Sequence, residues 1–227
     1  MRNHQNLGRI SPVENKEEFF TVFRMRGKSL GDFVDDFISV IISNWSNLSD
    51  KGVNPLNILG AGHYGCVFGT DDPDVVAKLT EDKGERLLFE ICMKNALHGF
   101  VRVDEISTLH SSHGTLYYFI MKERVTPFHS LSVELKGLFF NLSKQLKKYA
   151  NFILEGERLE GERILDDLSA DIDFFYIGDS LRKLLSMGYV VCDLHHGNIG
   201  INTEEDRICI YDGSLRKLPT SPYSQSL

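Results

Sequence analysis

Three closely spaced glycines lie between two segments with the composition of β-strands, and this feature limits the fold more than any other. They are Gly60, Gly62 and Gly65, in the run GAGHYG, and the β-prone residues CVF follow at once. In a dinucleotide-binding fold such glycines open a helix. The sequence therefore predicts a glycine-rich hairpin, whose backbone N–H groups can approach phosphate oxygens without side-chain obstruction. A plain tight turn has the same composition and is the alternative interpretation.

Hydrophobic periodicity around the glycines predicts a chain of the α+β class. A polar turn, TDDPD, ends the glycine segment, and Pro127 marks the change to a helix-rich sequence. The predicted strands are 57–69, 75–79, 101–108, 115–125, 189–193, 198–202 and 207–212. The predicted helices are an amphipathic segment at 29–47 with Ser29 as its N-cap, then 82–98, 131–154 and 164–187, with a charged loop at 155–163.

The overall composition excludes several classes of protein. Hydrophobic residues make up 42% of the chain and charged residues 25%, which is typical of a globular protein. The net charge of −7 argues against a protein that binds nucleic acid mainly by charge. No apolar stretch is long enough to cross a membrane, and the first residues, MRNHQNLGRI, lack the apolar core of a secretory signal. We therefore expect a cytoplasmic protein with no nucleic-acid or membrane partner.

The four cysteines, Cys66, Cys92, Cys192 and Cys209, are widely and irregularly spaced. A structural zinc site needs pairs such as CxxC, and the sequence contains none. Because apolar residues flank the cysteines, we expect buried thiols in a reducing compartment.

Lys78 lies in the apolar run VVAKL, where a buried charge is costly unless it has a partner. An edge strand whose lysine reaches solvent is one explanation. The glycines just upstream favour another, an ammonium group that binds phosphate. Two acids of the next helix could hold this lysine. Glu85 is explained as a helix-dipole partner in the first turn, so the predicted partner is Glu90, which Leu87 and Ile91 flank on the apolar stripe.

Asp193, Asn198 and Asp212 have the spacing and chemistry of a phosphate-transfer site. The segment VCDLHHGNIGI places Asp193 five positions before Asn198, and Asp212 follows at the end of the strand RICIYD. A carboxylate can accept the proton of an attacking hydroxyl, while an amide oxygen and a second carboxylate suit Mg²⁺. Any one of the three alone is explained as a solvated turn residue. His195 and His196 could suggest a transition-metal site, but no third ligand stands at metal spacing.

Taken in order along the chain, these motifs resemble the protein-kinase-like superfamily from about residue 57 to 214. The string DLHHGN is similar to the D-x-H-x-G-N loop of aminoglycoside phosphotransferases and other bacterial kinase-like enzymes, in which His195 would orient the loop. The resemblance implies a two-lobed α+β fold, with an antiparallel-sheet N-lobe that carries one main helix and a short, mostly helical C-lobe. The implied parts are an N-terminal extension with an amphipathic helix at 1–50, the N-lobe at 51–123 and the C-lobe at 124–227.

The resemblance also implies roles for single residues. Asp193 would be the catalytic base, Lys78 would contact the α- and β-phosphates of ATP while Glu90 holds it, and Asn198 and Asp212 would bind Mg²⁺, or Mn²⁺ in its place. Met121 would be the gatekeeper, and residues 122–125 would form the hinge that contacts adenine through backbone groups. The implied nucleotide-binding set is Gly60, Gly62, Gly65, Val67, Ala77, Lys78, Met121, Glu123 and Val125.

The implied activity is transfer of the γ-phosphate of ATP to a serine or threonine hydroxyl, or to tyrosine, of a protein. Minimal kinases of phages and secreted bacterial effectors are similar, so we expect a protein substrate of a host cell and a location in the host cytoplasm. The alternatives are a small-molecule kinase of the aminoglycoside-phosphotransferase type and a pseudokinase-like binding module. Transfer of AMP, the identity of the acceptor and the oligomeric state stay open.

Three departures separate the chain from the kinase pattern. Val191-Cys192-Asp193 replaces H-R-D, and Asp212-Gly213-Ser214 replaces D-F-G. Only 15 residues follow Asp212 in the 227-residue sequence, too few for an activation segment. We therefore expect that regulation and substrate docking come from elsewhere, and the need for an activating partner stays open.

Overall fold

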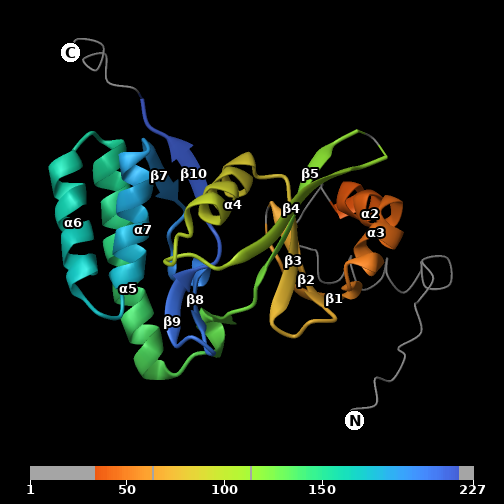
Figure 1. Ribbon diagram of the computed structural model, residues 1–227, viewed down its shortest axis with the longest axis horizontal. Helices are drawn as coiled ribbons and strands as arrows, with labels where there is room; N and C mark the ends of the chain where they lie inside the picture. Colours follow the sequence, from red (N-terminus) through yellow and green to blue (C-terminus); the bar gives the residue numbers. More distant parts are fainter. Residues whose placement is uncertain (1–33, 63, 113, 220–227) are drawn as a thin grey trace. The chain divides into compact units, whose positions relative to one another are not determined.

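The structure is a computed structural model that describes residues 34–62, 64–112 and 114–219 (Figure 1). The chain divides into two compact units. The first unit comprises 1–81 and 107–121, and the second unit comprises 82–106 and 122–227. The chain contains an antiparallel sheet and several helices, which confirms the predicted mixture of α and β structure.

The largest sheet has five strands in the order β1-β2-β3-β5-β4. Its strands in chain order are β1 (Val53–Ala61), β2 (Gly65–Thr70), β3 (Val75–Thr80), β4 (Val103–His110) and β5 (Leu116–Glu123). β1 pairs antiparallel with β2, and β2 with β3, as the two predicted turns require. The first three strands belong to the first unit, and the division between the units falls within β4 and β5.

Two helices, α2 (Val34–Ser43) and α3 (Trp45–Asp50), pack on one face of this sheet in the first unit (Figure 1). Phe37 of α2 lies edge-on to the Tyr117 ring at 4.7 Å, and the Tyr117 hydroxyl donates a hydrogen bond of 2.7 Å to Asp36. The apolar stripe of the predicted N-terminal helix therefore packs on one face of the sheet.

The predicted helix 29–47 is divided at Asn44 in the structure. The Asn44 side chain donates a 2.8 Å hydrogen bond to the carbonyl of Val40, a group that the helix backbone also uses. Such competition ends helices at asparagine. The predicted start at Ser29 lies outside the described residues.

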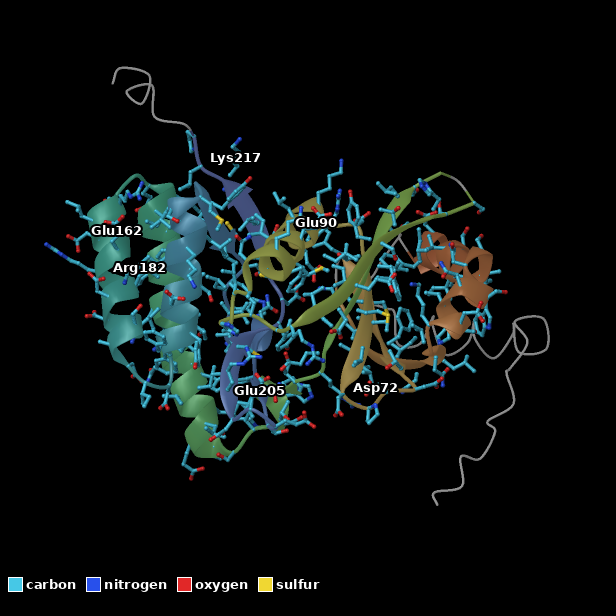
Figure 2. The ribbon with its side chains drawn as sticks, viewed as in Figure 1. Asp72, Glu90, Glu162, Arg182, Glu205 and Lys217 are labelled. Carbon is cyan, nitrogen blue, oxygen red and sulfur yellow. The ribbon has the colours of Figure 1, made fainter. Side chains whose placement is uncertain are left out.

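The helices of the second unit are α4 (Lys83–Asn95), α5 (Val133–Leu154), α6 (Arg158–Ala170) and α7 (Phe175–Ser186), with short 3₁₀ turns η2 (Phe128–Ser130) and η3 (His196–Asn198). Asp82 caps α4 by accepting hydrogen bonds from the backbone of Gly84 and Glu85. α5, α6 and α7 pack side by side through buried leucines (Figure 1). Arg182 of α7, labelled in Figure 2, forms an ion pair of 2.8 Å with Asp166 of α6.

The prediction of one helix at 164–187 is wrong, as is the charged loop at 155–163. α6 begins at Arg158, because ion pairs one turn apart, such as Arg158 with Glu162, stabilise a helix in this charged segment. α6 ends at Ala170, where the Asp171 carboxylate accepts a hydrogen bond of 2.9 Å from the backbone of Asp173. This turn competes with the helix and separates α6 from α7.

Two small antiparallel sheets complete the second unit. β7 (Tyr189–Cys192) pairs with β10 (Ser214–Lys217), while β8 (Ile199–Asn202) pairs with both β6 (Thr126–Pro127) and β9 (Arg207–Ile210). These short ladders hold the residues that carry the candidate chemistry.

The division into units differs from the predicted boundaries at 50/51 and 123/124. α2 and α3 group with the sheet that they cover, and α4 groups with the second unit, where it packs on β10. In the part of the chain that the structure describes, no helix combines the length and the apolar character that crossing a membrane requires.

Candidate functional site

The glycine segment forms a hairpin between β1 and β2, as predicted. Gly60 pairs with Val67 in the strand register, and the Gly62 N–H donates a hydrogen bond of 2.8 Å to the carbonyl of Gly65. No helix begins at these glycines, which excludes the dinucleotide-binding arrangement. A Cβ atom at Gly60 or Gly62 would have no heavy atom within 4 Å among the described residues. Packing in that part of the chain therefore does not explain glycine at these two positions.

Gly65 is required by packing. A Cβ atom there would lie 2.6 Å from the carbonyl oxygen of Leu79 and 3.2 Å from Cε of Lys78. The missing side chain thus lets β2 approach the Lys78 side chain closely. The glycine hairpin and the predicted phosphate-binding lysine are neighbours within the first unit.

Lys78 lies in β3 and its residue is only 7% exposed. Its register partner across β2 is Val67. Ala77 and Leu79, which flank Lys78 in β3, belong to the core under α2 and α3. Because side chains alternate along a strand, Lys78 and Val67 project from the opposite face of the sheet. The structure therefore brings together Lys78, Val67 and Gly65, as the predicted nucleotide-binding set requires.

Ala77 and Met121 lie on the wrong face of the sheet for that set. Both pack with the core under α2 and α3, Ala77 fully buried and Met121 partly so. A side chain that lines one pocket with Lys78 must share its face, so the nucleotide-contact prediction for Ala77 and the gatekeeper prediction for Met121 do not fit this register. Val76, two residues before Lys78, shares the sheet face of Lys78, which is the face that a nucleotide contact requires.

The predicted hinge residue Glu123 has structural partners in the second unit. It is buried, its N–H donates to the carbonyl of Arg102 at 2.9 Å, and its carboxylate accepts from the Arg102 N–H at 2.8 Å. Asn202 and Arg207 also donate to this carboxylate. The Glu123 N–H is therefore already used. Sequence reasoning overlooked this cluster because its members are far apart in the chain.

Val125, the other predicted hinge residue, is half-buried and packs against the chain at Gly200. A Cβ atom at Gly200 would lie 2.7 Å from a Val125 methyl carbon. This contact fixes the segment that leads from β5 into β6 and η2. The prediction that Val125 contacts adenine through its backbone stays a prediction.

The two acids of α4 have contacts that the sequence analysis did not predict. Glu90, labelled in Figure 2, forms an ion pair of 2.6 Å with Arg86, one turn earlier on the half-exposed face of α4. Glu85 is 3% exposed and lies 3.7 Å from the ammonium of Lys122, which is equally buried. A helix dipole alone therefore does not account for Glu85. The pairing of Glu90 with Lys78 stays a prediction.

Lys122 connects α4 to the segment before Asp212. Its ammonium donates a hydrogen bond of 2.5 Å to the carbonyl of Tyr211 and lies 4.5 Å from the Phe89 ring centroid. Sequence reasoning missed this lysine, although the signal used for Lys78, a lysine within an apolar strand, applies equally to LYYFIMKE.

The ends of two short ladders bring Asp193, Asn198 and Asp212 together. The pair Cys192 and Ser214 ends the ladder of β7 and β10, so Asp193 and Gly213 continue from the same end. The pair Ile199 and Ile210 ends the ladder of β8 and β9, so Asn198 and Tyr211 are neighbours, and the Tyr211 N–H donates to the Asn198 carbonyl at 2.9 Å. Pairing across strands thus places the three predicted residues in one cluster.

Asp193 has a backbone φ of +62°, the left-handed region that few residues other than glycine adopt. Its carbonyl accepts hydrogen bonds from the His195 N–H at 3.0 Å and from the Asn198 side-chain amide at 2.8 Å. The Asp193 side chain is 65% exposed, so its carboxylate is accessible to an acceptor. Such a constrained backbone with an exposed functional group is characteristic of sites under functional demand.

His195 fixes the loop rather than standing free. Its Nδ1 accepts a hydrogen bond of 3.0 Å from the Gly197 N–H, and its Nε2 lies 3.6 Å from the Asp193 carboxylate. This is the orienting arrangement that the D-x-H-x-G-N resemblance implies. His196 instead contacts the Phe128 ring, with centroids 4.4 Å apart.

The oxygen atoms of Asn198 and Asp212 suit a hard divalent cation. The Asn198 amide nitrogen faces two acceptors, the carbonyl and carboxylate of Asp193 at 2.8 and 3.2 Å, which fixes the amide orientation and turns the oxygen Oδ1 away. The Asp212 carboxylate accepts a hydrogen bond of 2.9 Å from the Gly213 N–H. Mg²⁺ takes one or two protein oxygen ligands and completes its shell with water and phosphate. Among the described residues no cluster of three or more His, Cys, Asp or Glu suits a metal ion.

The thiol of Cys192 directly precedes Asp193 and is half-buried. Burial raises its pKa, and the neighbouring Asp193 carboxylate adds to the rise. The thiol therefore stays protonated at neutral pH and adds no charge to the cluster.

No protein-family model matches the sequence, and no curated protein matches it either. Among solved structures, the chain is similar to the kinase PK-1 of the Cydia pomonella granulovirus, with 13% sequence identity and a TM-score of 0.44. The match covers 80% of this chain and 62% of that kinase, so this chain spans less than two thirds of its length. A likeness of this size decides neither the family nor the activity of the chain.

Proposed function

We propose that the chain is an ATP- and Mg²⁺-dependent phosphotransferase with a two-lobed kinase-like fold, and that it acts as a protein kinase on a serine, threonine or tyrosine hydroxyl. The observation that carries this proposal is the cluster of Asp193, Asn198 and Asp212, built by two independent ladders. The glycine hairpin beside Lys78 supports it from the first unit.

The residues fit the steps of phosphoryl transfer. The acceptor oxygen bonds to the γ-phosphorus while the bond from that phosphorus to the β–γ bridging oxygen breaks, and ADP leaves with the electron pair. Asp193 takes the proton of the acceptor hydroxyl, because its carboxylate is exposed and held in place by Asn198. Lys78 and the hairpin N–H groups bind the phosphates. Asn198 and Asp212 would hold Mg²⁺, which neutralises phosphate charge when bound.

The test measures transfer of labelled γ-phosphate from ATP to dephosphorylated casein, and to the chain itself, in the presence of Mg²⁺. We expect Asp193→Asn and Asp212→Asn to lower the rate by at least about a hundredfold. Asparagine tolerates the left-handed backbone of Asp193, so that variant removes the base and keeps the loop. Asp167→Asn, an exposed change on α6, is the matched control.

Equal rates in the wild-type chain and in both cluster variants would contradict the proposal. ATP binding without transfer to either acceptor would favour the pseudokinase-like module. Mass spectrometry of the product separates added phosphate from added AMP.

His195 provides a reason to include small molecules as acceptors. Its bond to the Gly197 N–H follows the D-x-H-x-G-N pattern of the aminoglycoside phosphotransferases. Transfer to an aminoglycoside that Asp193→Asn abolishes, with none to protein, would establish that second function.

A further inference from the structure

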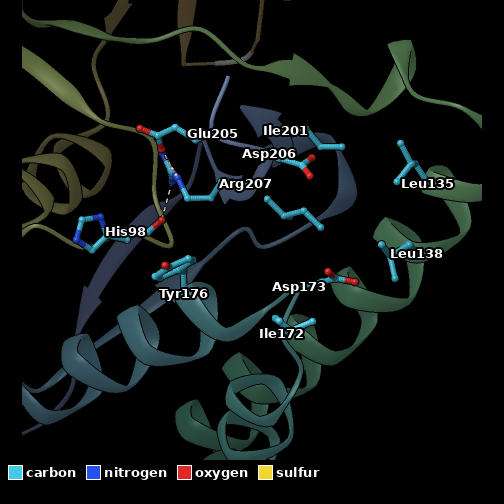
Figure 3. Close-up of a pocket in the computed structure, with 11 residues that line it drawn as sticks. His98, Leu135, Leu138, Ile172, Asp173, Tyr176, Ile201, Glu205, Asp206 and Arg207 are labelled. Carbon is cyan, nitrogen blue, oxygen red and sulfur yellow. Dashed lines mark hydrogen bonds and ion pairs between the residues drawn. The ribbon is translucent and has the colours of Figure 1, made fainter. Parts of the chain in front are cut away.

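The second unit contains a cavity of about 440 Å³ that none of the proposed chemistry uses (Figure 3). α5, the connection from α6 to α7, the start of α7 and the β8–β9 hairpin supply its walls. Four partly exposed apolar side chains line it, namely Leu135, Leu138, Ile201 and Ile208. At the rim, Ile172 is 89% exposed. Apolar surface gathered in this way is typical of a binding site.

The cavity lies away from the Asp193 cluster. It adjoins the turn that connects β8 to β9, whereas Asn198 and Tyr211 lie at the opposite end of the same hairpin. The four residues of β8 separate the two ends by roughly 13 Å. An occupant of the cavity therefore binds without taking the place of the acceptor hydroxyl.

The charge that the cavity offers to an occupant is negative. Its basic residues are His98 and Arg207, and of the two only the arginine carries a permanent charge. Glu123 and Glu205 already compensate this guanidinium at 3.2 and 2.8 Å. Asp173 and Asp206 also line the cavity, and within the described residues neither carboxylate is paired with a cation. Figure 3 shows both carboxylates beside the apolar side chains.

We propose that this cavity is a docking site for a peptide segment of a partner protein in which a lysine or arginine lies next to an apolar side chain. The apolar residue fills the space between Leu138 and Ile208, and the cation pairs with Asp173 and Asp206. A volume of about 440 Å³ accepts a few side chains rather than a folded surface. The inference is independent of phosphotransfer, because it concerns binding alone.

The experiment selects binders to the full chain from a library of random dodecapeptides displayed on phage. We expect the selected peptides to share a cation adjacent to Leu, Ile, Met or Phe. One such synthetic peptide is then titrated by fluorescence anisotropy. The double variant Asp173→Asn/Asp206→Asn should weaken its binding about tenfold or more, and the remaining affinity should depend less on salt. Ile172→Ser should also weaken it.

Matched controls keep the test specific. Asp167→Asn removes an exposed carboxylate of α6 and Leu159→Ser removes an exposed apolar side chain of the same helix, and both should leave binding within twofold. Asparagine suits the left-handed backbone at Asp206, whose φ is +47°, so the double variant should unfold at the wild-type temperature. Selected peptides without the cation, or equal binding by the double variant and the wild-type chain, would overturn the proposal. A selection that yields no binder would overturn it as well.

Discussion

Gly62 and Gly65 belong to one hairpin but have different surroundings. A Cβ atom at Gly62 meets nothing within 4 Å in the described chain, while one at Gly65 would press against the Leu79 carbonyl at 2.6 Å. Backbone close to open space is free to contact a ligand, whereas backbone in close contact with a neighbouring strand serves the fold.

Gly65→Ala should therefore lower the free energy of unfolding by about 1–3 kcal/mol, the usual cost of overpacking. Gly62→Ala should leave it within about 0.5 kcal/mol. Instead it should raise the KM for ATP about tenfold, because the added methyl group would obstruct the approach of a phosphate to the hairpin backbone at a cost of about one charged hydrogen bond. Urea unfolding and initial-rate kinetics measure the two quantities. A wild-type KM for ATP in the Gly62→Ala variant would contradict the proposal that the hairpin binds the phosphates.

Where the signal was local, the sequence was sufficient to select residues that the structure brings together, and their catalytic and metal-binding roles stay predictions. Asp193, Asn198 and Asp212 were recognised from spacing, and the turns that bring them together are short. Ala77 and Met121 were misplaced because a motif match assigns a position in the chain and not a face of the sheet. The strand period of two, counted from Lys78, selects Val76 instead of Ala77.

At the scale of elements, α4 is attached to the Asp212 segment by a buried charge pair. Glu85 on α4 and Lys122 on β5 are each 3% exposed, and Lys122 also binds the carbonyl of Tyr211. Removing one partner of a buried pair leaves the other charge uncompensated. The pair of Glu90 with Arg86 is partly exposed and contributes much less.

We therefore expect Glu85→Gln to lower the free energy of unfolding by about 3 kcal/mol and Glu90→Gln to change it by less than about 0.5 kcal/mol. Both variants replace one glutamate of the same helix with its isosteric amide, so each is the control for the other. Chemical denaturation followed by circular dichroism measures the difference. Equal losses would show that Glu85 is not the anchor of α4. Unchanged stability of Glu90→Gln with lost phosphotransfer would support the predicted pairing of Glu90 with Lys78.

The elements themselves were predictable to different degrees. The hairpins, α4 and the β7 to β9 region follow from periodicity and turn residues. The breaks at Asn44 and Asp171 were not predicted, because the apolar stripe continues through both and a side-chain hydrogen bond ends each helix. The cluster of Glu123, Arg207 and Asn202 was also beyond prediction, since Glu123 is about 80 residues from the other two and only the tertiary fold joins them.

At the scale of the whole molecule, buried thiols couple stability to pH. All four cysteines lie in the described residues and are free thiols, and Cys66, Cys92 and Cys209 are buried. Burial raises the pKa of each of these three from 9.0 to about 12. The folded chain therefore holds these protons in a range of pH where the unfolded chain releases them. Their contribution is fully present below pH 9 and is lost as the pH rises toward about 12.

We expect the free energy of unfolding to fall by about 1.4 kcal/mol per buried thiol between pH 7 and pH 10, or about 4 kcal/mol for the three. Burial also raises the pKa of Tyr117 and of Tyr149, which adds to the loss in the same direction. Urea titrations at the two pH values measure the change. Cys209→Ala is less stable at both values because it leaves a gap, but its difference between them should be about 1.4 kcal/mol smaller. An equal difference in that variant and in the wild-type chain would show that the Cys209 thiol ionises as readily in the folded as in the unfolded chain.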